Sequence, residues 1–471
     1  MENPKYLVTV FISGFCAMIV EIAGGRIIAP YLGTTIFTWS AVIGLVLGAL
    51  SIGYYIGGRL GDKYNNVKQL SLILIVAGFL TLTVPFFARL LLPATMFIDL
   101  KIASIIAAFI LVPSSLFYGM VSPYIIKLAI KKDSEGSVAG DIFSTSTVGS
   151  ILGVLVTGFI LIPNIPISVI FILGAFLMLL SSVILSRRIP FIELGVFLVV
   201  SFFMSGISYS HFVEGNVLYE GESPYYYITV TDTVFDNKSG ILLGLDSAYY
   251  SSGQTNDGDF LFDYAKKVRL TYPLLRDPKS FLILGNAAGT QAMDLRKNFP
   301  DSDIDTLEID DRLIDIGKKY FNFKPDERLR VINDDARRYV KATNLTYDMI
   351  IVDTYRGKSL PYHLTTVEFV SELKHVLKDD GLVVANTISP LGGESSETIK
   401  LIYLAYRSMF NDVFLIPMNH SDLGSQNILL IASDRDLGDF RIKYSDLIYN
   451  INTGSLSVPT DELNPIELFG H

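Results

Sequence analysis

The chain has 471 residues, 50% of them hydrophobic, with a mean hydropathy of +0.43 and a formal net charge of −9 at pH 7. This acidic balance disfavours nucleic acid as a partner, because its phosphates would be repelled. With Cys16 as its one cysteine and five scattered histidines, the sequence predicts neither a disulfide framework nor a metal site.

The two halves of the chain differ in composition. Residues 1–210 hold 12 Lys and Arg against 8 Asp and Glu, whereas residues 211–471 hold 26 against 39. The composition of the first half is typical of a membrane-spanning domain, and that of the second half is typical of a domain in water. We therefore expect a transmembrane helical domain over 1–210, a small β subdomain with a lead-in helix over 211–275, and a doubly wound α/β domain over 276–471.

The first half contains about seven apolar segments long enough to cross a bilayer core, which requires ~20 residues. Their approximate ranges are 6–30, 37–58, 68–92, 102–130, 138–162, 165–186 and 191–210. The second segment carries Gly44, Gly48, Gly53 and Gly57, and small residues at such spacing predict close packing against a neighbouring helix.

Two ionisable residues, Glu21 and Arg26, lie inside the first segment. Charged groups at membrane depth are costly unless they pair or face a cavity. They are compatible with a transport pathway or an acceptor-binding pair, but a structural ion pair, or Arg26 extending to the interface, is the favoured interpretation.

The second half opens with a period-two pattern of β-branched and aromatic residues. The segments 225–231 and 240–245 are predicted strands, and the turn-like run 236–240 joins them into an antiparallel hairpin. A helix is predicted over 260–272.

Residues 280–310 form the next unit. An apolar strand over 281–284 leads into a turn of small residues from Gly285 to Gly289, then into a helix over 290–298 and a second strand over 304–309. Glu308 and Asp310 close that strand. Doubly wound folds place an acid at this position, roughly 20 residues after a glycine turn, to accept hydrogen bonds from ribose hydroxyls.

The pattern then alternates between helices and strands. Helices are predicted over 311–320, 336–343 and 366–377, and strands over 329–332, 349–352 and 382–386, the last one following a turn over 378–381. This alternation favours a parallel, Rossmann-like sheet. Because the carboxyl ends of its strands share one edge, Glu308, Asp335 and Asp353 are expected at the same ligand-binding edge.

The residues resemble the polyamine aminopropyltransferase (spermidine synthase) family, in particular members fused to an N-terminal multi-helix membrane domain. The resemblance is carried by residues 20–64 and, in order, by ESPYYYITV, LLGLDS, the Gly285 turn, LEIDDRLI, NDDARRYV and YDMIIVD. The run RLGDK at 59–63 is also similar to a loop signature of major-facilitator transporters.

The resemblance implies a role for each matching residue. Glu308 would hold the ribose hydroxyls with Asp310 beside it, and Asp335 would hold the adenine amino group. Gly285 and Gly289 would let the backbone approach the nucleoside. Asp353 matches the carboxylate that takes a proton from the attacking amine, a step that displacement at carbon requires because the nucleophile must be neutral. It could alternatively be a structural cap.

Three positions depart from the family pattern. The family has ammonium-anchoring aspartates where this chain has Ala288 and Arg356, and a glutamine where it has Tyr226. Tyr226, Tyr355 and Arg356 are therefore the candidate substrate-binding residues. Arg356 and Lys358 favour a negative group where the family holds a positive one, although Arg356 could also be an ordinary solvent-facing loop residue.

We interpret the chain as a membrane-integrated, spermidine synthase-like transferase. Its co-substrate is expected to be decarboxylated S-adenosylmethionine or S-adenosylmethionine, without a metal. The acceptor is a small-molecule amine or a membrane-bound group, and membrane lipids and a second copy of the chain are the other expected partners. One alternative is methyl or aminocarboxypropyl transfer from S-adenosylmethionine to a membrane-bound acceptor. Another is a transporter whose second half senses a nucleoside.

Localisation is predicted in the cell membrane, with several passes. Lys and Arg cluster at alternate segment ends, which places the N-terminus in the cytoplasm. Seven spans would then leave the second half outside the cell, where a nucleoside cofactor is not expected. Either segment 191–210, which contains Glu193, does not cross, or the domain faces out. We favour a cytosolic domain.

Overall fold

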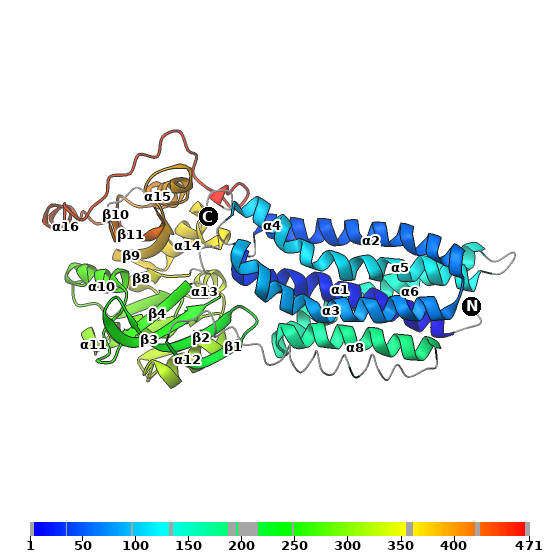
Figure 1. Cartoon of the computed structure of the whole chain (residues 1–471). Helices are drawn as coiled ribbons and strands as arrows, with labels where there is room; N and C mark the ends of the chain where they lie inside the picture. The colour runs from blue at the N-terminus through cyan, green and yellow to red at the C-terminus, as the bar shows by residue number, and fades with distance from the viewer. Residues whose placement is uncertain are drawn as a thin grey trace. The chain divides into compact units, whose positions relative to one another are not determined.

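The computed structural model describes residues 4–33, 35–95, 98–130, 135–186, 195, 215–246, 249–354, 361–419 and 424–466 (Figure 1). The chain divides into two compact units. One comprises Met1–Phe212 with Glu222–Tyr226, and the other comprises Val213–Gly221 with Tyr227–His471.

The first unit is a bundle of long apolar helices. Within the described residues, six helices are long and apolar enough to cross a membrane. They are α1 (Pro4–Leu32), α2 (Ile36–Tyr64), α3 (Val67–Thr95), the continuous run of α4 (Leu100–Ala108), η1 (Phe109–Leu111) and α5 (Val112–Ala129), the run of α6 (Glu135–Val156), η2 (Thr157–Leu161) and α7 (Ile162–Asn164), and α8 (Ile167–Ser186). The first six predicted segments are thus confirmed as helices. The predicted segment 191–210 lies outside the described residues, apart from residue 195.

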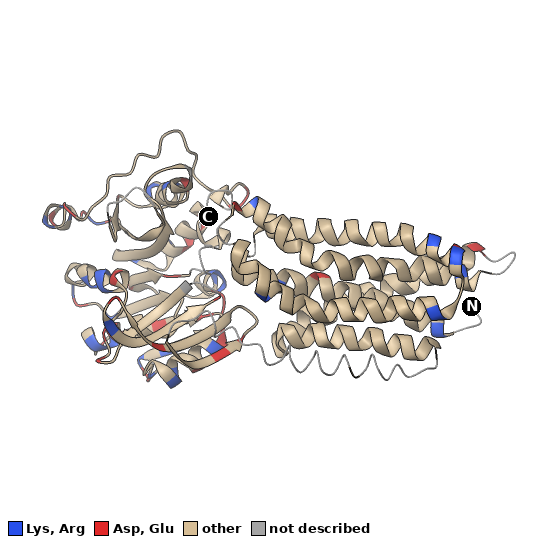
Figure 2. Cartoon of the chain, viewed as in Figure 1, with Lys and Arg blue, Asp and Glu red and all other residues tan. Residues whose placement is uncertain are grey.

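Charge is sparse along these helices, and blue and red residues lie mostly near the helix ends (Figure 2). Glu21 and Arg26 both lie within α1. The Arg26 guanidinium donates a hydrogen bond to the Ser223 carbonyl oxygen, 3.0 Å away, within the same unit. This hydrogen bond gives one guanidinium N–H group of Arg26 an acceptor, and so reduces the cost of placing a polar group among apolar helices.

Glycines bring two pairs of helices into close contact. A Cβ atom at Gly53 of α2 would overlap the carbonyl oxygen of Leu116 in α5, and one at Gly14 of α1 would overlap that of Ser146 in α6. By contrast, a Cβ at Gly44 or Gly48 would meet no atom within 4 Å. The predicted packing role therefore holds for Gly53 and for Gly57, where a Cβ would overlap the Met120 carbonyl oxygen of α5. It is wrong for Gly44 and Gly48, because those two glycines face no neighbouring helix among the described residues.

The second unit begins with a four-stranded antiparallel sheet in the order β1-β2-β3-β4. Its strands are β1 (Asn216–Glu222), β2 (Tyr227–Phe235), β3 (Lys238–Leu245) and β4 (Tyr249–Thr255). Asp236 and Asn237 join β2 to β3 with φ values of +48° and +59°. Two successive positive φ values define the type I′ turn that matches strand twist, so the predicted hairpin is confirmed. The predicted helix 260–272 is shorter: α10 spans Asp263–Val268 and tightens into the 3₁₀ helix η4 (Arg269–Leu274).

A seven-stranded sheet follows in the order β10-β11-β9-β8-β5-β6-β7 among the residues described. The strands are β5 (Ser280–Leu284), β6 (Asp303–Glu308), β7 (Leu329–Asn333), β8 (Tyr347–Val352), β9 (Leu377–Ser389), β10 (Asp412–Pro417) and β11 (Gln426–Ser433). β9, β8, β5, β6 and β7 are parallel, whereas β11 is antiparallel to β9 and β10. The predicted parallel sheet is confirmed, with two further strands that the sequence analysis does not assign.

One predicted turn is wrong. Residues 378–381 belong to β9, which begins at Leu377. Tyr347 pairs with Leu377 but Met349 pairs with Leu382, so the register shifts between them. A bulge of this kind accommodates extra polar residues inside a strand without ending it.

Helices cover both faces of this sheet. Leu282 and Leu284 of β5 join a core with Val340, Phe369 and Ile399, whereas Phe281 and Ile283 join one with Val268, Leu295, Ile314 and Phe440. The first face is therefore covered by α13 (Ala336–Ala342), α14 (Val367–His375) and α15 (Glu397–Met409). The second is covered by α10, α11 (Thr290–Asn298), α12 (Asp311–Tyr320) and α16 (Gly438–Lys443). A strand buried on both faces is apolar without alternation, as the sequence of β5 predicts.

Candidate active site

The glycine turn after β5 is fixed by close backbone contacts. Gly285 has φ +94°, and a Cβ there would overlap the backbone carbonyl oxygen of Asp353. Its N–H donates to the Leu307 carbonyl at 3.1 Å, and the Asp353 N–H donates to the Leu284 carbonyl at 2.8 Å. Only glycine can adopt this φ and also lie this close to the Asp353 backbone. The close packing of the turn brings the ends of β5, β6 and β8 together.

The far end of the turn is equally constrained. Gly289 has φ +80° and packs against the ring of Phe323, which a Cβ would overlap. Ala288 is completely buried, and a Cβ on Gly317 of α12 would lie 2.7 Å from the Ala288 carbonyl oxygen. The methyl group of Ala288 thus occupies enclosed space beside α12, and contributes no charge to the site.

Glu308 at the end of β6 is held against the turn. Its side chain is buried, with 6% exposure. One carboxylate oxygen accepts a hydrogen bond from the Ala287 N–H at 2.7 Å, and the other accepts one from the Asp310 N–H at 3.1 Å. Burial raises the pKa of Glu308 to about 7, and these backbone donors counteract only part of that effect. Each oxygen retains a second lone pair that a ligand hydroxyl could use.

Asp310 and Asp335 both cap helices. Asp310 is completely buried and accepts the Arg312 N–H at 3.1 Å at the start of α12. Asp335 follows β7 and accepts the Arg338 N–H at 2.9 Å through Oδ1. Its Oδ2 atom lies 3.9 Å from Nε2 of His363. One oxygen of Asp335 thus caps α13 (Ala336–Ala342), and the other lies at the sheet edge.

Asp353 follows β8 and is held between two donors. Asn386 of β9 donates to Oδ1 at 2.9 Å, and the Tyr264 hydroxyl of α10 donates to Oδ2 at 3.2 Å. Asn427 of β11 in turn donates to the Asn386 side-chain oxygen at 3.0 Å. Burial raises the pKa of Asp353 to about 6, while the two direct donors favour the ionised form. A carboxylate with this pKa is ionised at neutral pH and close to the value that suits a general base.

Sequence reasoning did not identify Tyr264 and Asn386 as partners of Asp353. They lie 89 and 33 positions away in the chain. The position of Asn386 at the carboxyl end of a predicted strand was an available signal, since adjacent parallel strands end at the same edge.

The structure brings Gly285, Glu308 and Asp353 together, and places Asp335 at the same sheet edge. Tyr355 and Arg356 lie outside the described residues. Tyr226 belongs to the segment that groups with the first unit, where its N–H donates to the Ser223 hydroxyl at 2.9 Å. Within the described ranges, no group of three or more His, Cys, Asp or Glu side chains could hold a metal ion.

A glycine turn after a strand that lies between two parallel strands with acids at their ends is typical of doubly wound α/β domains that bind nucleosides. Residues 268–414 match the family model of the spermine/spermidine synthase domain. For this part of the chain, the match confirms the resemblance noted from the sequence.

Several proteins are similar to this chain. It is 36% identical over 157 residues to a polyamine aminopropyltransferase of Vibrio vulnificus (strain CMCP6), covering 32% of this chain and 51% of the relative. It is 30% identical over 217 residues to a probable polyamine aminopropyl transferase of Bifidobacterium longum (strain NCC 2705), covering 45% and 46%. The chain thus spans about half of the length of these relatives.

Other similarities extend further along the chain. Polyamine aminopropyltransferase 2 of Aquifex aeolicus (strain VF5) is 25% identical over 392 residues, covering 80% of this chain and 77% of the relative. Among solved structures, a probable spermidine synthase from Corynebacterium glutamicum ATCC 13032 has a TM-score of 0.42 and 22% identity, covering 52% of this chain and 100% of that one.

The raised pKa of Glu308 predicts how stability depends on pH. The pKa is 4.5 without the protein environment and about 7 in the fold, so the folded state binds this proton more tightly. The stabilisation is complete below pH 4.5 and is lost as pH rises to about 7, a change on the order of 3 kcal/mol. Calorimetric unfolding of the full chain between pH 4.5 and 7.5 should show a smaller loss for Glu308→Gln than for the unmodified protein.

The exposed Glu327 supplies a control, since Glu327→Gln should retain the slope of the unmodified protein. Equal slopes for the unmodified protein and Glu308→Gln would contradict the burial of an ionisable carboxyl group at position 308.

Proposed function

We propose that the chain is a membrane-integrated transferase of the spermidine synthase type. It would move an aminopropyl group from decarboxylated S-adenosylmethionine to an amine. The observation that carries this proposal is the Asp353 carboxylate, held by Tyr264 and Asn386 beside the Gly285 turn in a domain that matches the spermine/spermidine synthase model.

The nucleoside of the co-substrate would bind across the carboxyl edge of the sheet. Glu308 would accept hydrogen bonds from the ribose hydroxyls, and Asp335 would accept one from the adenine amino group through Oδ2. Gly285 and Gly289 would hold the turn next to the ligand, because their positive φ values and close packing against Asp353 and Phe323 fix its path. Asp310 would contribute by fixing the start of α12, because its carboxylate caps that helix.

The chemical step is a displacement at the carbon beside the sulfonium. The lone pair of a neutral amine forms the new N–C bond, and the C–S bond breaks with its electron pair going to sulfur, which leaves a neutral thioether. The proton released from the amine nitrogen passes to Asp353. Tyr264 and Asn386 orient the carboxylate, so that it meets the amine without rearrangement.

One observation favours a second donor. Ala288 stands where the family places an ammonium-anchoring carboxylate, and its side chain is buried and neutral. A site without that carboxylate does not repel the carboxylate of full S-adenosylmethionine. Transfer of a methyl or aminocarboxypropyl group from S-adenosylmethionine to a membrane-bound acceptor is therefore the second candidate. Arg356 would support it, and its role stays a prediction.

An assay of the full-length protein in detergent, with each donor in turn and with diamines as acceptors, tests the reaction. We expect decarboxylated S-adenosylmethionine to be consumed with formation of an aminopropylated amine. Asp353→Asn should lower kcat by about 10²- to 10⁴-fold, because the base is lost, while the Kd of the donor changes little. Exclusive consumption of S-adenosylmethionine would establish the second candidate instead. Full activity of Asp353→Asn would remove Asp353 from the chemistry.

We further propose that the six apolar helices anchor the protein in the cell membrane with the second unit in the cytosol, where an adenosyl donor is available. Ser239 lies exposed in β3. In a Cys16→Ala background, the cysteine of Ser239→Cys should react with a membrane-impermeant thiol reagent only after cells are opened. Labelling in intact cells would place this unit outside and contradict a cytosolic donor.

A further inference from the structure

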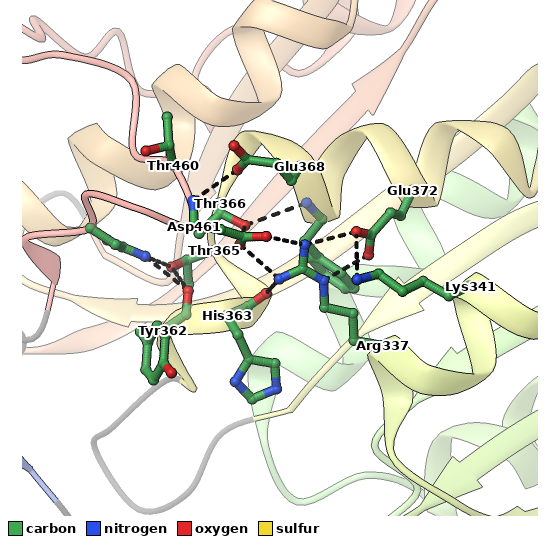
Figure 3. A network of polar contacts seen from close by, with 12 residues as sticks. Arg337, Lys341, Tyr362, His363, Thr365, Thr366, Glu368, Glu372, Thr460 and Asp461 are labelled. Carbon is green, nitrogen blue, oxygen red and sulfur yellow. Dashed lines mark hydrogen bonds and ion pairs between the residues drawn. The ribbon is translucent and has the colours of Figure 1, made fainter.

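The side chain of Arg337, in the first turn of α13, is buried among carboxylates (Figure 3). Nε and Nη2 each donate to one oxygen of Glu372 at 2.7 Å, and Nη1 and Nη2 each donate to one oxygen of Asp461 at 2.7 Å. Nη1 also donates to the His363 carbonyl oxygen at 2.8 Å. Paired bidentate contacts fix a guanidinium in position and in plane, which a lysine could not reproduce.

Asp461 belongs to a C-terminal segment, residues 459–464, that is fastened to residues 362–368. Its carboxylate accepts the Thr366 hydroxyl at 2.7 Å. The other bonds run from Val367 N to Pro459 O at 2.9 Å, from Asn464 Nδ2 to Tyr362 O and to Thr365 Oγ1 at 2.8 Å each, and from Asp461 N to Glu368 Oε2 at 3.0 Å. Figure 3 shows this segment and α14 meeting at the Arg337 side chain. The segment therefore holds residues far earlier in the chain.

Arg337 is connected to Asp335 in two ways, through the start of α13 and through His363. Arg337 follows Asp335 by two residues in the same helix start, and it also holds the backbone of His363. The His363 ring lies 3.9 Å from the Asp335 carboxylate oxygen that does not cap the helix. Burial lowers the pKa of His363, which favours the neutral form of its ring. The second oxygen of Asp335 thus lies beside the ring of a residue whose backbone Arg337 holds.

We propose that Arg337, anchored by Asp461, is a positioning residue that sets the orientation of Asp335 toward the adenine base, and that the C-terminal segment thereby determines base specificity. This inference rests on the proposed function, in which Asp335 accepts a hydrogen bond from the adenine amino group. Loss of the Asp461 charge would free Arg337 to shift, and α13 and residue 363 with it. The site would then lose its preference for a base that carries an amino group.

The test compares two probes with the full-length protein in detergent. 5′-Methylthioadenosine carries the amino group, and 5′-methylthioinosine carries an oxygen in its place. We expect the unmodified protein to prefer the adenine probe. In Asp461→Asn, the ratio of the two Kd values should fall by about tenfold, because a hydrogen bond to a charged group is lost, while the Kd of the inosine probe stays nearly constant.

Lys341→Gln is the matched control. Lys341 contacts Glu372 at 3.3 Å, so this variant changes the same charge cluster while leaving the hydrogen bonds of Arg337 to Asp461 and His363 in place. It should keep the preference of the unmodified protein. Asn464→Ala removes the two hydrogen bonds to Tyr362 and Thr365, and one from the Ile466 N–H, without altering a charge. It should reduce the preference in the same direction. It keeps the inference testable if Asp461→Asn does not fold.

The outcomes separate the two hypotheses. Binding of neither probe by the unmodified protein would overturn the proposed function. Preference for the adenine probe in the unmodified protein, retained in folded Asp461→Asn and Asn464→Ala, would overturn the inference alone. Thermal unfolding of each variant shows whether it is folded. In a folded variant, a purely structural role of Asp461 would weaken the binding of both probes equally and leave the ratio of their Kd values unchanged.

Discussion

The contact between Gly285 and the backbone of Asp353 is the constraint on which the candidate site depends. The turn after β5 runs so close to the end of β8 that a side chain at position 285 would overlap the Asp353 carbonyl oxygen. This approach places the turn N–H of Ala287 against Glu308 and leaves the Asp353 carboxylate in the same region. One missing methyl group therefore lets three strands deliver their functional residues to one edge.

Burial dominates the electrostatics of this edge. It raises the pKa of both Glu308 and Asp353, and in each case hydrogen-bond donors offset part of the cost of ionisation. A positive charge placed near these two buried carboxyl groups would stabilise their ionised forms. An adenosyl-sulfonium ligand supplies one, so its binding would favour the ionised form of each carboxyl group and would be stabilised in return. Burial of these two carboxyl groups, which the sheet imposes, thus favours the positively charged class of ligand that we propose.

The sequence predicts the parts of this arrangement that depend on local pattern. Strand periodicity and the glycine turn place Gly285, Glu308, Asp335 and Asp353 at one sheet edge, since strand direction alone decides which ends meet. The two partners of Asp353 differ in this respect. Asn386 ends the neighbouring predicted strand and was open to the same reasoning, whereas Tyr264 comes from a helix before the sheet, so its contact depends on tertiary packing. The polar run in β9 was predicted as a turn because a bulge depends on the partner strand.

The clearest test of a nucleoside site at this edge is calorimetric binding of S-adenosylmethionine and its decarboxylated form to the full-length protein and to two variants. We expect Glu308→Gln and Asp335→Ala each to weaken binding of the preferred form by about 1–3 kcal/mol, because each leaves ligand groups without a charged acceptor. Unchanged affinity in both folded variants would contradict the assignment of this edge as the nucleoside site.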